Sequence, residues 1–226
     1  MKHDMHFKVG ENSLIGIGEI ALFSYLLLVV AIAVLRVVTG FPFVADLTSS
    51  PMLIMHGEWW RLFTSALVIQ GPPVPQVIAI AVLGTFGIYF GGSGTFWMTA
   101  LAGHILGTLI AYAGFIAVWL GDRAAYAHFL TDPDYGVSLV WCAALGAFGA
   151  LAWLGHRRDM RRPAHPYIAM TAVAAMVLVT IYSDDMAAVQ HVIAFLIGAI
   201  IIATADRSKT LYKDRRSLRT LRLARR

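Results

Sequence analysis

The chain has 226 residues, of which 58% are hydrophobic and only 14% are charged. Together with a mean hydropathy of +0.70, this balance excludes a soluble domain of useful size and predicts a polytopic membrane protein. The formal net charge is +5, and it comes largely from the last twenty or so residues. The single cysteine, Cys142, excludes a disulfide bond within one chain.

Six apolar stretches are candidates to cross a bilayer, which takes about 20 residues each. They predict an all-α bundle of six transmembrane helices in one domain, residues 15–205, between an N-terminal tail, 1–14, and a basic C-terminal tail, 206–226. The predicted spans are 15–37, 74–90, 95–119, 137–155, 167–182 and 188–205. The segment 39–73 is too long and too aromatic for a plain loop, and its tryptophans suit the headgroup boundary.

Lysine and arginine lie mainly on one side of this six-span arrangement. The N-terminal tail, the joint at 156–166 and the C-terminal tail are basic, whereas the joints on the other side are rich in aspartate. The positive-inside rule therefore predicts that both termini are cytoplasmic. No cleavable signal peptide or organelle-targeting segment is visible in the first stretch. We expect an integral protein of a bacterial plasma membrane.

A serine and a histidine are predicted at the same depth on two different spans. Ser138 lies in the first turn of the fourth predicted span and His191 about one turn into the sixth, and both spans begin on the outer side. Ionisable residues within a bilayer are rare and are functional candidates by default. A serine beside a basic group is the minimum machinery for an activated nucleophile. Taken singly, Ser138 suits a helix cap and His191 an interfacial or core histidine.

Another histidine, His104, lies near the middle of the third predicted span, between Gly103 and Gly107. One interpretation pairs it with His191 as ligands of a haem, although the predicted depths of the two residues differ. The other gives it a hydrogen bond inside the bundle, where the glycines allow close helix packing. The basic tail is interpreted as a topological anchor on anionic lipid, in preference to a nucleic-acid-binding segment.

Four segments, in order along the chain, resemble the rhomboid family of intramembrane serine proteases. EWWRLFT, residues 58–64, resembles the tryptophan–arginine stretch of that family's membrane-embedded first loop. Gly92-Ser93-Gly94 stands at the turn between the second and third spans, as in the family. Gly136-Val137-Ser138 resembles the start of the family's GxSG motif. His191, with Gly198 seven positions later, resembles the histidine-and-glycine face of the sixth span.

The resemblance implies that Ser138 is the nucleophile and His191 the general base, with no third acid. It implies no cofactor and no metal ion. It also implies that Gly146 is a packing glycine on the same span as the serine. The expected site is a water-filled cavity open to the outside, and the expected substrates are transmembrane helices of other membrane proteins.

The chain departs from the family's pattern where an oxyanion is usually bound. Rhomboid proteases usually carry a histidine and, four residues later, an asparagine at the outer end of the second span. Here these positions hold Val74 or Pro75, and then Ile78 or Ala79. Losing one oxyanion donor costs about 10²–10³ in rate. The remaining candidates for donors are backbone N–H groups beside the serine and the side-chain amide of Gln76.

Three further departures lie close to the predicted pair of residues. Leu139 replaces the glycine after the serine, and Cys142 replaces the aromatic residue that usually stacks on the histidine. Ala194 replaces a glycine that usually lets the fourth and sixth spans touch. We therefore keep a second function open, that of a catalytically inactive rhomboid-like scaffold that binds transmembrane helices of partner proteins.

Overall fold

The computed structural model describes residues 16–39, 44–158 and 164–224, with side chains for 16–39, 45–155 and 166–205. The predicted tail 1–14 and the side chains of the basic tail lie outside these ranges. The long helices of the described part are α1 (Ile17–Thr39), α5 (Pro73–Gly91), α6 (Ser93–Gly121), α8 (Val137–Arg158), α9 (Ala164–Ile181) and α10 (Asp185–Ala224). The short ones are α2 (Val44–Leu47), α3 (Pro51–Met55), α4 (Arg61–Thr64), the 3₁₀ turn η1 (Ser65–Leu67) and α7 (His128–Thr131).

The predicted all-helical membrane bundle is confirmed. Helices α1, α5 and α6, together with Val137–Gly155 of α8 and Asp185–Ala205 of α10, are long and apolar enough to cross a membrane. The stretch predicted as the fifth span coincides with α9, whose 18 residues are about 27 Å long at ~1.5 Å per residue. That is slightly less than the ~30 Å of a hydrocarbon core. The chain thus has the helices of an integral membrane protein.

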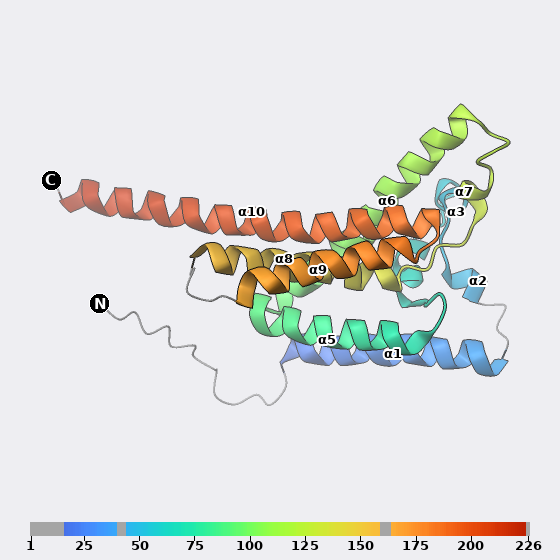
Figure 1. Ribbon diagram of the computed structural model, residues 1–226, viewed down its shortest axis with the longest axis horizontal. Coiled ribbons are helices and arrows are strands. Elements are labelled where there is room, and N and C mark those ends of the chain that lie inside the picture. Colours follow the sequence, from blue (N-terminus) through green and yellow to red (C-terminus); the bar gives the residue numbers. More distant parts are fainter. Residues whose placement is uncertain (1–15, 40–43, 159–163, 225–226) are drawn as a thin grey trace.

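The long helices alternate in direction along the bundle (Figure 1). Helices α5, α8 and α10 begin at one end, which we call the cavity end, and α1, α6 and α9 run toward it. The short helices α2, α3 and α7 lie at this end as well. Helix α10 extends beyond the rest of the bundle at the opposite end, where α1 begins.

Helix α8 is the central helix of the bundle. In its apolar 18-residue stretch 61% is buried, against 11% in the corresponding stretch of α1. It meets α10 at very short range because glycines stand at the crossing. A Cβ atom at Gly146 would lie 2.0 Å from the carbonyl oxygen of Phe195, and one at Gly198 would lie 2.0 Å from that of Ala143. Small residues at helix crossings allow this close packing in membranes. Ala194 is fully buried in the same crossing, so its methyl group does not hold the helices apart.

The segment between α1 and α5 folds around the side chain of Arg61. Its Nη1 donates to the carbonyl oxygens of Ala45, Asp46 and Thr48 at 2.6–3.0 Å, and its Nε donates to Glu58 at 2.5 Å. The guanidinium is buried, and such a charge is stable only when it is paired and hydrogen-bonded. One arginine thereby fixes the path of a segment that has no long helix of its own.

The tryptophans of this segment are exposed, as the sequence predicts for residues at a membrane boundary. Trp59 and Trp60 are 55% and 49% exposed. The ring of Trp60 packs 4.6 Å from the guanidinium carbon of Arg61. Such an arrangement suits an amphipathic ring that has one apolar face and one polar neighbour.

Candidate functional site

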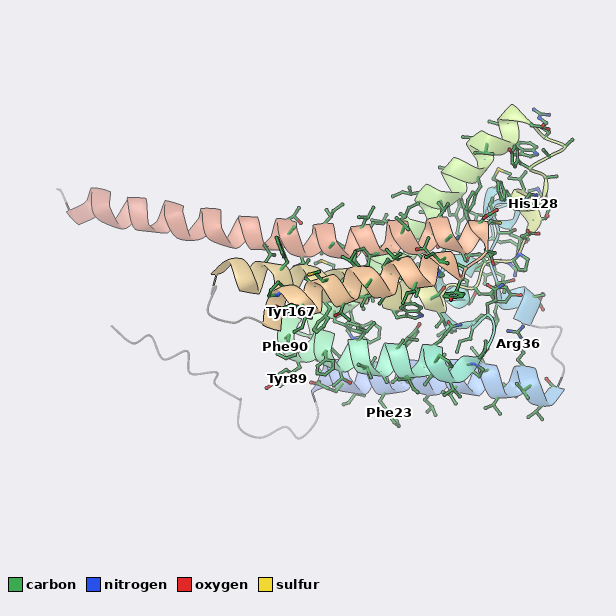
Figure 2. All side chains as sticks on the ribbon, viewed as in Figure 1. Phe23, Arg36, Tyr89, Phe90, His128 and Tyr167 are labelled. Atoms are coloured by element: carbon green, nitrogen blue, oxygen red, sulfur yellow. The ribbon has the colours of Figure 1, made fainter. Side chains whose placement is uncertain are left out.

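A cavity of about 730 Å³ lies at the cavity end of the bundle, where α8 and α10 begin and α9 ends. Figure 2 labels His128, one of the lining residues, at this end, and labels Tyr89, Phe90 and Tyr167 at the opposite end. Ser138 and His191 both line the cavity. Its lining also includes the polar residues Gln70, Gln76, Asp132, Asp134, Tyr135, Ser183, Asp184, Asp185 and Gln190.

Ser138 lies in the first turn of α8, as the sequence predicts. Its hydroxyl donates to the carbonyl oxygen of Tyr135 at 3.4 Å. That is long for an O–H···O bond, whose usual range is about 2.5–3.0 Å, so the hydroxyl is held weakly. No hydrogen bond joins Ser138 to His191, both of which the structure describes.

His191 is 5% exposed. Its Nδ1 lies 3.0 Å from the hydroxyl oxygen of Ser183. Its Nε2 is buried and has no hydrogen-bond partner among the described residues. Buried polar atoms are almost always paired, and this unpaired nitrogen belongs to a residue that lines the polar cavity.

An aromatic ring does lie beside His191, but it comes from Trp141. The two ring centroids are 6.2 Å apart with an interplanar angle of 34°. The expectation that an aromatic ring is missing here, because Cys142 stands at the family's aromatic position, was wrong. Cys142 is fully buried and packs with Leu139 and Ala194 in the apolar core between α8, α9 and α10. Leu139 is likewise directed into that core.

The positions that usually bind an oxyanion point elsewhere in this chain. Val74 and Ile78 are 65% and 56% exposed and line an apolar groove between α1 and α5. The alternatives, Pro75 and Ala79, are not among the residues that line the cavity. Gln76 lines the cavity, but its amide donates to the carbonyl oxygen of Gln70 at 2.5 Å. Trp141 also lines the cavity, and its indole N–H is buried with no hydrogen-bond partner among the described residues. The first N–H groups of α8 also lack carbonyl partners within the helix.

A buried polar network beside the cavity escaped the sequence analysis. The Asp134 carboxylate accepts hydrogen bonds from the Tyr112 hydroxyl and from the Gln190 amide, each at 3.0 Å. The Ser49 hydroxyl lies 2.8 Å from that of Tyr112, and the backbones of Ser49 and Asp134 form a β-bridge. Four separate parts of the chain are thus joined next to His191. Burial raises the pKa of Asp134 to about 6, and the nearby charge of Asp184 adds to this effect.

His104 holds the first turn of α8 in place from the side. Its Nε2 donates to the Leu62 carbonyl oxygen at 2.6 Å. A Cβ atom at Gly136 would lie 2.1 Å from its Cε1, so only glycine fits between the ring and α8. The Gly136 N–H donates to the Ser65 carbonyl oxygen at 2.9 Å. These contacts give His104 a packing role and engage its Nε2, while its Nδ1 is buried against Gly136 with no hydrogen-bond partner among the described residues.

Comparison with known proteins gave no match to any protein-family model, curated protein or solved structure. The chemistry of the site is therefore argued from its own side chains. Within the described ranges no group of three or more His, Cys, Asp or Glu residues is arranged to hold a metal ion. The residues around one cavity carry a weakly held hydroxyl, an imidazole nitrogen and an indole N–H, the last two with no partner among the described residues.

Proposed function

We propose that this protein is a rhomboid-like intramembrane serine protease. Ser138 attacks the carbonyl carbon of a substrate peptide bond, and His191 takes the serine proton and returns it to the leaving amine. Water then hydrolyses the acyl-enzyme, with His191 again as the base. The observation that carries the proposal is that His191, whose buried Nε2 has no hydrogen-bond partner among the described residues, lines the same polar cavity as Ser138.

The weak bond of Ser138 to Tyr135 supports this function. A hydroxyl that is held at 3.4 Å gives up little energy when it rotates, because even a well-formed hydrogen bond contributes only about 1 kcal/mol net. Catalytic hydrogen bonds are often long or badly aligned without substrate and tighten when it binds. Substrate binding would then bring the serine into reach of the histidine.

Two sets of donors are suited to the oxyanion. The first is the start of α8, where the N–H groups of Val137 and Ser138 lack intrahelical partners and lie at the positive end of the helix dipole. The N–H of Leu139 already donates to the Gly136 carbonyl oxygen at 3.1 Å. The second is the indole N–H of Trp141, which lies one turn after Ser138 and has no hydrogen-bond partner in the described part of the chain. Together they would replace the histidine and asparagine that the second span lacks.

The membrane setting of the proposal follows from the sequence. We propose six spans with α9 as the fifth, both termini in the cytoplasm, and the cavity facing outward. The substrates would be transmembrane helices of other proteins, and the basic end of α10 would contact anionic lipid. The polar lining of the cavity supports a site that admits water at membrane depth.

One specific observation favours a second function, that of an inactive scaffold for transmembrane helices. The only hydrogen bond of the Ser138 side chain in the described residues goes to the start of its own helix, at Tyr135. In a scaffold this would be an ordinary local bond from a serine hydroxyl to the carbonyl three residues earlier, and His191 would be a packed histidine held by Ser183.

A fluorophosphonate probe tests the two functions without knowledge of a substrate. The purified protein, in detergent and in liposomes, would be compared with Ser138→Ala and His191→Ala. We expect labelling of the wild type and none of either variant. A folded wild type that stays unlabelled, beside a rhomboid protease that labels under the same conditions, would refute the protease and leave the scaffold.

A further inference from the structure

Ser183 stands in the short turn between α9 and α10 and contacts both helices. Its hydroxyl donates to the Val179 carbonyl oxygen of α9 at 2.6 Å and lies 3.0 Å from Nδ1 of His191 on α10. The next residue, Asp184, caps α10 by accepting from the Ala187 N–H at 2.8 Å. The turn is thus fixed at both ends by its own side chains.

The unpaired carbonyl groups at the end of α9 determine the direction in which the Ser183 hydroxyl donates its proton. The last four carbonyl groups of a helix lack intrahelical donors, and the N–H of Ser183 donates to Thr180 and not to Val179. The hydroxyl therefore satisfies the Val179 oxygen. A serine hydroxyl has one proton. If that proton pointed at His191 instead, two bare oxygen atoms would face each other at 2.6 Å.

This direction fixes the tautomer of the imidazole. With its proton on the Val179 bond, the Ser183 oxygen can only accept from His191, so Nδ1 carries the hydrogen. A neutral imidazole has one N–H and one bare nitrogen, which leaves a lone pair on Nε2. That is the ring nitrogen without a partner in the described part of the chain.

We infer that Ser183 is a positioning residue for His191: it holds the ring and keeps Nε2 bare, in the form that can accept a proton from Ser138. The inference rests on the proposed function for its catalytic meaning, while the tautomer itself is a property of the fold. A neutral hydroxyl here takes the orienting role that a carboxylate plays in a serine–histidine–aspartate triad.

The tautomer can be measured directly, without activity. The full chain would be labelled with ¹⁵N-histidine in detergent at a pH where histidine is neutral, and His191→Gln would assign the signals. We expect a protonated Nδ1 and a bare Nε2 in the wild type and in Ser183→Thr, and a mixture of tautomers in Ser183→Ala. A protonated Nε2 in the wild type, or an unchanged tautomer in Ser183→Ala, overturns the inference.

A matched control is Thr180→Val. The Thr180 hydroxyl bonds a carbonyl oxygen of the same helix, that of Met176, at 2.9 Å. We expect its loss to leave the His191 tautomer unchanged. A tautomer that shifts equally in this variant would mean that the whole helix end, and not the Ser183 hydroxyl, orients the ring, and would overturn the inference.

Probe labelling then separates this inference from the proposed function. A positioned base contributes roughly 10²–10⁴ in rate. We expect Ser183→Ala to be labelled about ten- to hundredfold more slowly than the wild type, and Ser183→Thr to recover the wild-type rate of labelling. Equal labelling of wild type and Ser183→Ala overturns the positioning role and leaves the protease. An unlabelled wild type overturns the protease, and the tautomer then decides the role of Ser183 alone.

Discussion

Replacing Asp134 with asparagine should remove a pH-dependent loss of stability between about pH 4 and pH 6. Burial raises the carboxyl pKa from 3.8 to about 6 in the fold. The folded chain therefore holds this proton more tightly than the unfolded chain, and the free energy of unfolding falls as pH rises through that window. A shift of about two pKa units corresponds to roughly 3 kcal/mol, since one unit is about 1.4 kcal/mol. Above pH 6 the loss is complete.

Asparagine is neutral throughout this pH range. The free energy of unfolding of Asp134→Asn, relative to that of the wild type, should therefore rise by roughly 3 kcal/mol from pH 4 to pH 7. It can still accept from Tyr112 and Gln190, but its NH₂ group would face the Tyr135 N–H that the carboxylate accepts from. That cost is the same at every pH and does not affect the slope.

The assay is denaturant unfolding of both proteins in detergent micelles at several pH values. Asp132→Asn is the matched control, because Asp132 lines the same cavity but is exposed. It should leave the pH dependence close to that of the wild type. A difference between Asp134→Asn and wild type that is constant from pH 4 to pH 7 would refute the account of a buried carboxyl.

Three further substitutions test the close packing of α8 on α10, the hydrogen bonds of Arg61, and the indole N–H of Trp141. Gly146→Ala should destabilise the bundle by about 1–3 kcal/mol in the same unfolding assay, because the new methyl group would lie 2.0 Å from the Phe195 carbonyl oxygen. Its control is Gly114→Ala, which should be neutral or stabilising because a Cβ atom there meets nothing within 4 Å. Arg61→Lys should cost about 2 kcal/mol, since hydrogen bonds to charged groups contribute about 1.5–3 kcal/mol, and a melting temperature equal to wild type would contradict this. Trp141→Phe should slow probe labelling about 10²-fold if the indole N–H serves the oxyanion, whereas Trp97→Phe, which removes another unpaired indole N–H, should not.

The bundle was predictable because hydropathy reports directly on helices in lipid. Backbone groups in a bilayer must be satisfied within the segment, so a long apolar run has few alternatives to a helix. The predicted stretches 74–90 and 137–155 accordingly match α5 and the apolar part of α8 closely. The fold of the segment between α1 and α5 was not predictable, because it depends on where one arginine finds its carbonyl partners.

The candidate site was predictable only in part. Motif spacing places Ser138 and His191 at the same end of their helices, and both line one cavity. The spacing of residues in a motif says less, however, about the direction in which each side chain leaves its helix. One residue along a helix turns a side chain by about 100°, which is why Trp141, and not Cys142, packs beside His191. Asp134 escaped notice because its partners come from distant parts of the chain.

The two candidate functions differ in which side chain would have to move. His191 is fixed by the Ser183 bond, by its burial and by the adjacent Trp141 ring, so displacing it would break several contacts at once. Ser138 has one long bond to Tyr135, and rotation about its Cα–Cβ bond breaks only that. For the proposed protease this means a base that stays in place and a hydroxyl that can rotate. In the proposed protease the bare Nε2 of His191 serves as the base, whereas in a scaffold it would cost about 1–3 kcal/mol as an unpaired polar atom. That difference favours the protease.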